Sequence, residues 1–200
     1  MALRIVLTGG PASGKTVTVQ ALSAERPDRF IAVPEAATQV YAAANTRWDL
    51  QDAEGQRVLQ RRMYHLQRAQ EERLAREYPG RILLLDRGTV DGSVYWPDGT
   101  DAYWQDLGTT RVAEVRRYDA VIWMETAAAI GIYDGSLSNP CRFEDAAGAV
   151  VNGEKLLHAW SGIHRLVKIP AFQRIAEKTA AVRQAIAEIE AEHFPRLPER

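Results

Sequence analysis

The residues with the clearest chemical meaning lie near the N-terminus, where residues 9–16 fit the pattern G-x-x-x-x-G-K-[ST]. In this pattern the glycines let successive backbone N–H groups point inward, where they cradle phosphates. Lys15 would add a point charge at the β- and γ-phosphates, and the Thr16 hydroxyl would ligate a bridging Mg²⁺ ion. The pattern therefore predicts a site for ATP and Mg²⁺. The expected nucleotide-binding residues are Gly9, Gly10, Pro11, Ala12, Ser13, Gly14, Lys15 and Thr16.

The segments on either side of this motif are those that a phosphate loop requires. Residues 3–7 form a short apolar run rich in β-branched side chains, which is typical of a strand buried on both faces. Residues 15–25 continue without a breaker until Pro27, which predicts a helix. The alternative is a glycine-rich turn with an exposed lysine, but the order strand, loop, helix favours phosphate binding.

Charged residues also follow two later apolar runs. Glu35 comes after the run at 30–33, and Asp86 and Arg87 come after the run at 82–85. In a parallel sheet of strand order 2-3-1-4-5, both strand ends lie beside the phosphate loop. Asp86 would then hold Mg²⁺ directly or through water, Arg87 would clamp substrate or the transferring phosphate, and Glu35 would act as general base. The alternatives are helix N-caps for the carboxylates and a surface ion pair for Arg87.

The rest of the chain alternates between strand and helix patterns. Residues 120–124 and 166–169 are predicted strands, and the stripes of apolar residues in 52–78 and 172–189 predict amphipathic helices. This alternation predicts an α/β fold with a mainly parallel sheet and helices on both faces. Together with the phosphate loop, it leads us to expect the three-layer fold of the P-loop NTPase type, with five parallel strands in the order 2-3-1-4-5.

We expect a single domain over residues 1–194 and a C-terminal tail over 195–200. Residues 126–149 are rich in Ala, Gly, Ser and Asn and have weak periodicity, so a lid is expected there.

Composition narrows the possible partners. The 25 Lys and Arg residues balance 26 Asp and Glu residues, so no overall basic field exists to attract nucleic acid or an anionic membrane. Cys141 is the only cysteine, which excludes an internal disulfide framework and fits a reducing cytoplasm. No window approaches the ~18 uninterrupted apolar residues of a membrane span. We therefore expect a cytoplasmic protein without a membrane span.

Three segments together carry a resemblance to a known family. The sequences GGPASGKT at 9–16, VPEAA at 33–37 and DRGTVD at 86–91, followed by YWP at 95–97, resemble the AAA-type P-loop family that includes NadR-type nicotinamide riboside kinase domains. More distantly, they resemble the deoxyribonucleoside kinases. The resemblance runs over about residues 5–170.

In the deoxyribonucleoside kinases, a glutamate after the second strand acts as base, and an acid–arginine pair after the third strand binds metal and the acceptor hydroxyl. The resemblance implies these roles for Glu35, Asp86 and Arg87. It also implies a lid arginine, for which Arg142 is the candidate because no other arginine lies between residues 117 and 165. Kinase lids often carry more than one arginine, so the chain departs from the family here. Asp91 is a further candidate, either for the acceptor substrate or as a helix cap.

Three functions fit these residues. The first is a kinase that transfers the γ-phosphoryl group of ATP to a hydroxyl of a nucleoside-like acceptor, with Lys15, Arg87 and Arg142 neutralising its charge and Glu35 as base. The second is an ATPase or GTPase that acts as a conformational switch, and the third is a nucleotide-binding regulatory module. ATP is preferred over GTP because Trp-Met-Glu-Thr stands at residues 123–126, in place of the Asn-Lys-x-Asp segment that recognises guanine.

For two further groups of side chains, the sequence is compatible both with a place in a ligand pocket and with a purely structural role. Four aromatic residues follow the third strand and would stack on a flat acceptor or pack in the core: Tyr95, Trp96, Tyr103 and Trp104. Six arginines on the long helix would line an acceptor pocket or form a solvated face: Arg57, Arg61, Arg62, Arg68, Arg73 and Arg76.

Overall fold

The computed structural model describes residues 2–133 and 145–193. The strands are β1 (Leu3–Thr8), β2 (Phe30–Val33), β3 (Ile82–Asp86), β4 (Ala120–Met124) and β5 (Leu166–Ile169). The α-helices are α1 (Lys15–Glu25), α2 (Ala36–Ala44), α3 (Ala53–Glu77), α4 (Thr100–Asp106), α5 (Arg111–Val115), α6 (Ala146–Ala159) and α7 (Ile175–His193). Three short 3₁₀ helices complete these elements: η1 (Trp48–Leu50), η2 (Asp91–Tyr95) and η3 (Ala127–Ile130).

The strands form one parallel sheet in the order β2-β3-β1-β4-β5, which confirms the predicted topology. Leu7 pairs with Asp86, and Val33 pairs with Leu85, so the ends of β1, β2 and β3 lie level with one another. This register brings the segments that follow these three strands to a common edge of the sheet.

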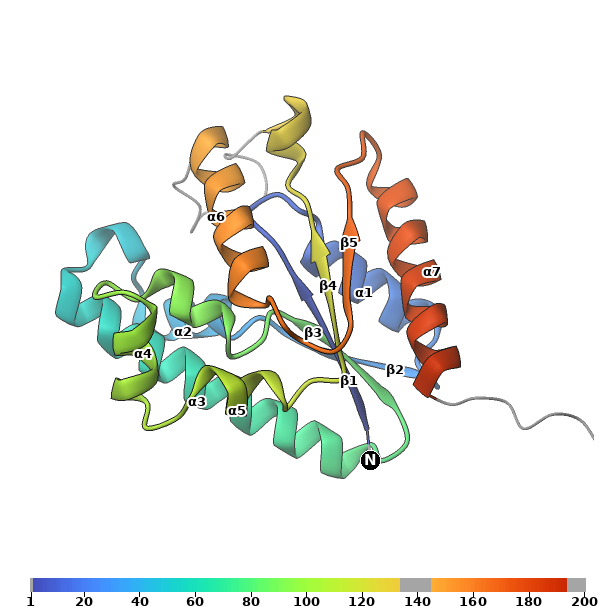
Figure 1. Cartoon of the computed structure of the whole chain (residues 1–200), viewed down its shortest axis with the longest axis horizontal. Helices are drawn as coiled ribbons and strands as arrows, with labels where there is room; N and C mark the ends of the chain where they lie inside the picture. Colours follow the sequence, from blue (N-terminus) through green and yellow to red (C-terminus); the bar gives the residue numbers. More distant parts are fainter. Residues whose placement is uncertain (1, 134–144, 194–200) are drawn as a thin grey trace, which may run out of the picture.

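Helices cover both faces of the sheet (Figure 1). Because successive side chains of a strand point to opposite faces, Leu3, Ile5 and Leu7 pack with α1 and α7, whereas Val6 packs on the opposite side. That opposite core includes residues of α3 and α6 and the fully buried Trp160. The three predicted layers are therefore present.

The predicted helices agree closely with those observed. The helix at 15–25 is confirmed, and the helix expected at 52–78 is α3, for which the Asp52 carboxylate accepts a bond from the Gly55 N–H at 2.8 Å. The last helix begins at Ile175, three residues later than expected. The sequence did not predict α2, α4 and α5, because helices of 9, 7 and 5 residues offer too few turns for a periodic pattern. It also did not predict the longer α6, whose first turn lies in the Ala- and Gly-rich stretch expected to be a lid.

The expected lid at 126–149 is only partly described. Its first part contains η3, and α6 already begins at Ala146, within the expected lid. Residues 134–144, which include Cys141 and the candidate lid arginine Arg142, lie outside the described residues, as does the expected tail at 195–200.

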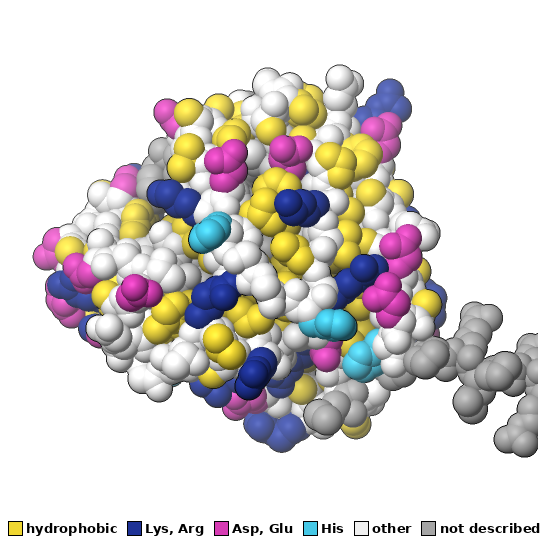
Figure 2. Space-filling model, viewed as in Figure 1, with side chains coloured by type: hydrophobic (Ala, Val, Ile, Leu, Met, Phe, Trp, Pro, Cys, Tyr) yellow, Lys and Arg dark blue, Asp and Glu magenta, His cyan; other side chains and the backbone are white. Residues whose placement is uncertain are grey.

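The described surface is mixed in charge. On the face shown in Figure 2, basic and acidic side chains are interspersed with apolar ones. Within residues 2–133 and 145–193, none of the helices combines the length and the apolar character that crossing a membrane demands.

Candidate active site

Two glycines shape the loop between β1 and α1. Gly9 has φ +143°, and a Cβ atom added to it would lie 2.1 Å from the carbonyl oxygen of Met124. Gly14 is the N-cap of α1 with φ +85°, in the left-handed region that favours glycine. A side chain at Gly9 would require the backbone to shift, and one at Gly14 would stand in a strained conformation against the Ile175 side chain. The local sequence therefore determines the path of this loop.

Lys15 lies over the same loop. Its Nζ atom donates to the carbonyl oxygens of Gly9 at 2.9 Å and Gly10 at 3.0 Å, and to Ser13 Oγ at 3.0 Å. Only 6% of the residue is exposed. The ammonium group is thus held close to the N-terminus of α1, where the helix dipole adds further positive potential.

Thr16, at the start of α1, forms a pair with Asp86 at the end of β3. Thr16 Oγ1 donates to Asp86 Oδ2 at 2.5 Å, while Asp86 Oδ1 is buried and has no hydrogen-bond partner. Burial and the neighbouring Glu35 carboxylate raise the pKa of Asp86, and Lys15 acts in the opposite direction. A hydroxyl beside a carboxylate with one uncommitted oxygen fits Mg²⁺, which takes few protein ligands and keeps waters or phosphate oxygens.

The described residues contain no group of three or more His, Cys, Asp or Glu side chains that could hold a metal by themselves. A metal held by Thr16, by Asp86 and by the phosphates of a bound nucleotide would require no such group.

Glu35 and Arg87 face each other across the ends of β2 and β3. Arg87 Nε donates to Glu35 Oε1 at 2.7 Å, and Thr38 Oγ1 donates to Glu35 Oε2 at 2.7 Å. The Arg87 and Glu35 side chains are only 17% and 19% exposed. Burial alone would raise the pKa of Glu35, but Arg87 and Lys15 outweigh it and leave the pKa below its ordinary value. Glu35 is therefore a carboxylate at neutral pH.

Asp91 fixes the other side of Arg87. Arg87 Nη1 lies 3.2 Å from Asp91 Oδ2, and the same carboxylate accepts bonds from Thr8 Oγ1 at 2.9 Å and from Trp160 Nε1 at 2.5 Å. Asp91 is 2% exposed, and burial raises its pKa although Arg87 lowers it. The N-cap of η2 is Val90, so Asp91 is not the cap of that helix.

The backbone of Arg87 has φ +75°, which few residues other than glycine adopt. Such a conformation costs about 1–3 kcal/mol and persists only where the surroundings hold it. It directs the Arg87 side chain toward Glu35 and Asp91, and it brings the guanidinium carbon to 5.8 Å from the centre of the Tyr95 ring.

One cavity of about 1000 Å³ connects these groups. It is lined by part of the phosphate loop, by Glu35, Arg87 and Asp91, and by side chains of the α2–α3 region. The lining from that region includes Tyr41, Asn45, Trp48, Gln60, Met63 and Gln67. A volume of this size lies at the upper end of the range for ligand pockets, so it can hold more than a single phosphate group.

The structure places the aromatic residues after β3 and the arginines of α3 in different surroundings. Trp96, Tyr103 and Trp104 are buried in the core between the sheet and α3, and Tyr103 also reaches the cavity wall. Tyr95 lines the cavity next to Trp48, with ring centres 6.4 Å apart and nearly perpendicular planes. The arginines of α3 are not part of the cavity lining. Four of them form ion pairs: Arg57, Arg61, Arg68 and Arg73.

Sequence reasoning did not identify several residues of the site. Thr8 and Trp160 bind Asp91 through side chains 83 and 69 positions away. Trp48 and Tyr41 reach the cavity from segments without a motif. The one signal in the sequence was the polar Thr8 at the end of β1, directly before the phosphate loop.

A model of the AAA domain family matches residues 4–178. The chain belongs to the AAA domain family. A search of curated protein sequences found no significant match.

Solved structures with the same fold include two of NadR, one in complex with NAD and AMP-PNP and one in complex with NR. Their TM-scores are 0.66 and 0.67, and each is 16% identical to this chain over 99% of its length. The chain spans 52% of each NadR chain, about half of its length. At this identity the likeness shows the fold alone.

Proposed function

We propose that this protein is a kinase that transfers the γ-phosphoryl group of ATP to a hydroxyl of a nucleoside-like acceptor. The observation that carries the proposal is the single cavity in which the phosphate loop and the Glu35–Arg87–Asp91 group face a common space. An NTP hydrolase needs room for a water molecule only. Here the cavity extends between α2 and α3 and offers room for a second organic molecule.

The loop residues and Lys15 would bind the β- and γ-phosphates of the nucleotide, since backbone N–H groups and an ammonium meet at the N-terminus of α1. Glu35 would accept a hydrogen bond from the acceptor hydroxyl and take its proton as the phosphoryl group moves across. Arg87 would stabilise the negative charge of the transferring group. A loose transition state requires only a weak base, so the lowered pKa of Glu35 is compatible with this role.

Thr16 and Asp86 would hold Mg²⁺, Asp86 directly or through water. When bound, the ion would neutralise phosphate charge and orient the γ-phosphoryl group. The contribution of the chain is to keep the Thr16 hydroxyl beside a buried carboxylate oxygen that is free of hydrogen bonds.

The base of the nucleotide would lie in a second cavity, of about 480 Å³, between η3 and the start of α7. Its walls include Ile130, Phe172 and Arg174. Both walls adjoin the phosphate loop, because the Ala127 N–H donates to Ala12 O at 3.3 Å and a Cβ on Gly14 would lie 2.5 Å from the Ile175 side chain. The lining also includes Gln173 and Glu177, so the cavity combines apolar side chains and a guanidinium, which could stack on a flat heterocycle, with polar groups that could bond to its edge.

The acceptor would place its ring near Trp48 and Tyr95 and its hydroxyl near Glu35. Two rings with nearly perpendicular planes at 6.4 Å offer a face and an edge to a flat ligand. Because one of the NadR structures holds NR, nicotinamide riboside is the first acceptor to test.

The test is ADP release from ATP and Mg²⁺ in the presence of nucleosides, nicotinamide riboside and simple sugars. A kinase releases ADP only when its acceptor is present. Release that does not depend on an acceptor indicates an NTP hydrolase, and binding of ATP without release indicates a regulatory module. Either of these outcomes contradicts the proposal.

A further inference from the structure

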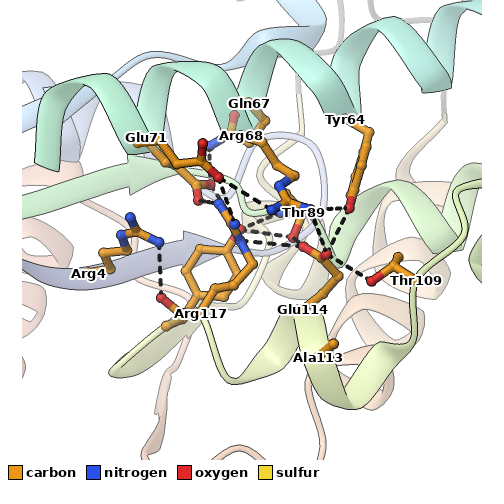
Figure 3. A network of polar contacts seen from close by, with 12 residues as sticks. Arg4, Tyr64, Gln67, Arg68, Glu71, Thr89, Thr109, Ala113, Glu114 and Arg117 are labelled. Carbon is orange, nitrogen blue, oxygen red and sulfur yellow. Dashed lines mark hydrogen bonds and ion pairs between the residues drawn. The ribbon is translucent and has the colours of Figure 1, made fainter. Parts of the chain in front are cut away.

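A buried polar cluster lies behind the cavity, between α3 and α5 (Figure 3). Glu71 and Glu114 are 0% and 2% exposed, and the Arg117 guanidinium bridges them at 2.7 Å and 3.4 Å. Tyr118 donates from its hydroxyl to Glu71 Oε1 at 2.8 Å, and Tyr64 donates to Glu114 Oε1 at 2.7 Å. We call these five residues the Glu71–Glu114 cluster.

The cluster holds Thr89 by its backbone and by its side chain. The Thr89 hydroxyl donates to Glu114 Oε2 at 2.8 Å, and the Thr89 N–H donates to the Tyr118 hydroxyl at 2.9 Å. The Thr89 carbonyl oxygen accepts a bond from the Tyr103 hydroxyl at 2.9 Å. Every polar group of this residue therefore has a partner in the interior.

Thr89 lies midway between two residues of the proposed site, Arg87 and Asp91. The Arg87 carbonyl oxygen is also held from behind, by Gln67 Nε2 at 3.2 Å, and Gln67 Nε2 donates to Glu71 at 2.9 Å as well. The cluster is thus connected to the start and to the middle of the segment whose backbone strain, φ +75° at Arg87, requires external support.

Energetics favour a positioning role over simple stabilisation. Burying two carboxylates and a guanidinium costs desolvation energy, which apolar residues of similar volume would avoid. Glu71, Glu114, Arg117 and Tyr118 are not part of the cavity lining, so four of the five residues do not contact a ligand there, whereas Tyr64 and the Thr89 that the cluster holds lie in the cavity wall. Polar residues are needed at these positions because the cluster binds the N–H and the hydroxyl of Thr89, which apolar side chains could not do.

We infer that the Glu71–Glu114 cluster positions Arg87 and Asp91 for phosphoryl transfer and that it acts through Thr89. The cluster consists of positioning residues, and the inference rests on the proposed kinase function. Loss of the Thr89 hydroxyl leaves a buried carboxylate with one hydrogen bond fewer and lets the segment 87–91 relax.

The test is Thr89→Val, which keeps the shape of the side chain but removes the hydroxyl. We expect kcat for the acceptor to fall about tenfold, the effect of one lost hydrogen bond to a charged group. The affinity for ATP should stay within about twofold, because the phosphate loop does not contact the cluster. Thr89→Ser restores the hydroxyl and should recover most of kcat.

Thr179→Val is the matched control. Thr179 is also buried, at 7% exposed, and its hydroxyl lies 3.3 Å from that of Thr18 on the other side of the sheet. It should lower the melting temperature without the fall in kcat. The inference is overturned if Thr89→Val keeps the kcat of the unmodified protein, if Thr179→Val lowers kcat equally, or if Thr89→Ser fails to restore it.

Amide hydrogen exchange provides a readout that does not depend on activity. In Thr89→Val the amides of residues 87–91 should exchange at least tenfold faster, while the amides of the phosphate loop should exchange at an unchanged rate. In Thr179→Val the amides of residues 87–91 should exchange as in the unmodified protein. If the unmodified protein releases no acceptor-dependent ADP, the proposed function fails, and exchange alone then decides whether the cluster holds this segment. Equal exchange in both proteins overturns the inference.

Discussion

The two sides of the main cavity are built in different ways. The phosphate loop consists of eight consecutive residues whose path is fixed by glycine conformations and by the start of α1. The acceptor side consists of side chains that meet from distant segments: Glu35 and Arg87 are 52 positions apart, and Thr8 and Asp91 are 83 positions apart. A local turn can be read from local sequence, whereas the acceptor side exists only once the strands pair in register.

This difference has a consequence for mutations. On the loop, backbone groups do most of the proposed phosphate binding. Among substitutions of loop side chains, we therefore expect the replacement of Lys15, the single charged residue, to reduce activity most. On the acceptor side, each side chain holds another, and a change at one position moves its neighbours.

The largest expected effect is that of Lys15→Ala on the loop side. Removing the ammonium that lies over the phosphate loop should lower kcat/KM about 10³-fold and weaken ATP binding, because its charge would no longer offset that of the γ-phosphate. Steady-state kinetics and calorimetric titration with ATP measure both effects. Lys155→Ala, a change of an exposed lysine on α6, is the control. Unchanged ATP affinity in Lys15→Ala would show that the loop does not bind phosphate.

On the acceptor side, Glu35→Gln should lower kcat about 10²-fold and leave ATP affinity unchanged. The amide keeps the size of the side chain but cannot take the proton of the hydroxyl. Glu188→Gln, on the exposed side of α7, tests the same chemical change away from the cavity. A kcat equal to that of the unmodified protein would exclude Glu35 as the base.

The ion pair between Glu35 and Arg87 makes a prediction about pH. In the unmodified protein the pKa of Glu35 should lie below its ordinary 4.5, so the pair stabilises the fold above that pH and loses its contribution as pH falls through the lowered pKa. In Arg87→Gln the favourable guanidinium charge is gone while the burial remains, so the pKa of Glu35 should be higher than in the unmodified protein. Titration of the Glu35 carboxyl by NMR measures both values. Identical midpoints would contradict the coupling.

A smaller effect is expected where the ring of the acceptor would bind. Trp48→Ala should raise KM for the acceptor about tenfold through lost stacking, with kcat changed by less than about twofold. Leu50→Ala removes an exposed apolar side chain of the same 3₁₀ helix and serves as control. If both variants have the same KM, the aromatic pair does not contact the acceptor.

The smallest effect is expected on the outer face of α3. Arg73 is 60% exposed and pairs with Glu77, so Arg73→Ala should change the free energy of unfolding by no more than about 0.5 kcal/mol and leave KM and kcat unaltered. Chemical denaturation and steady-state kinetics measure these quantities. A raised acceptor KM would instead place the arginines of this helix in the substrate site.

Much of the fold was predictable from sequence, because buried parallel strands appear as short apolar runs that alternate with helices, and because the phosphate loop indicates the fold type that has this strand order. Glu35, Asp86 and Arg87 could be placed near the loop for the same reason, since each follows a strand end. Their mutual contacts could not be predicted. The Arg87 side chain contacts Glu35 from a left-handed backbone conformation. Neither Arg87 itself nor the residues that follow it, Gly88 and Thr89, indicate this conformation in the sequence.

The Glu71–Glu114 cluster was even less predictable. Its members are ordinary charged and tyrosine residues of α3, of α5 and of the turn before β4, and on an amphipathic helix a glutamate normally faces solvent. Glu71 can be buried because Arg117 neutralises its charge, and this partner lies 46 residues further along the chain. No local pattern encodes such a pairing.

The most direct test of the kinase assignment follows the γ-phosphoryl group itself. The protein is incubated with Mg²⁺, nicotinamide riboside or another nucleoside, and ATP that is radiolabelled in its γ-phosphate, and the products are separated. We predict that the label appears in the phosphorylated nucleoside, in an amount equal to the ADP formed, and that Glu35→Gln suppresses this transfer. Label that is found only in inorganic phosphate, or that stays in ATP with every acceptor, would contradict the proposal that this cavity joins a nucleotide to an acceptor.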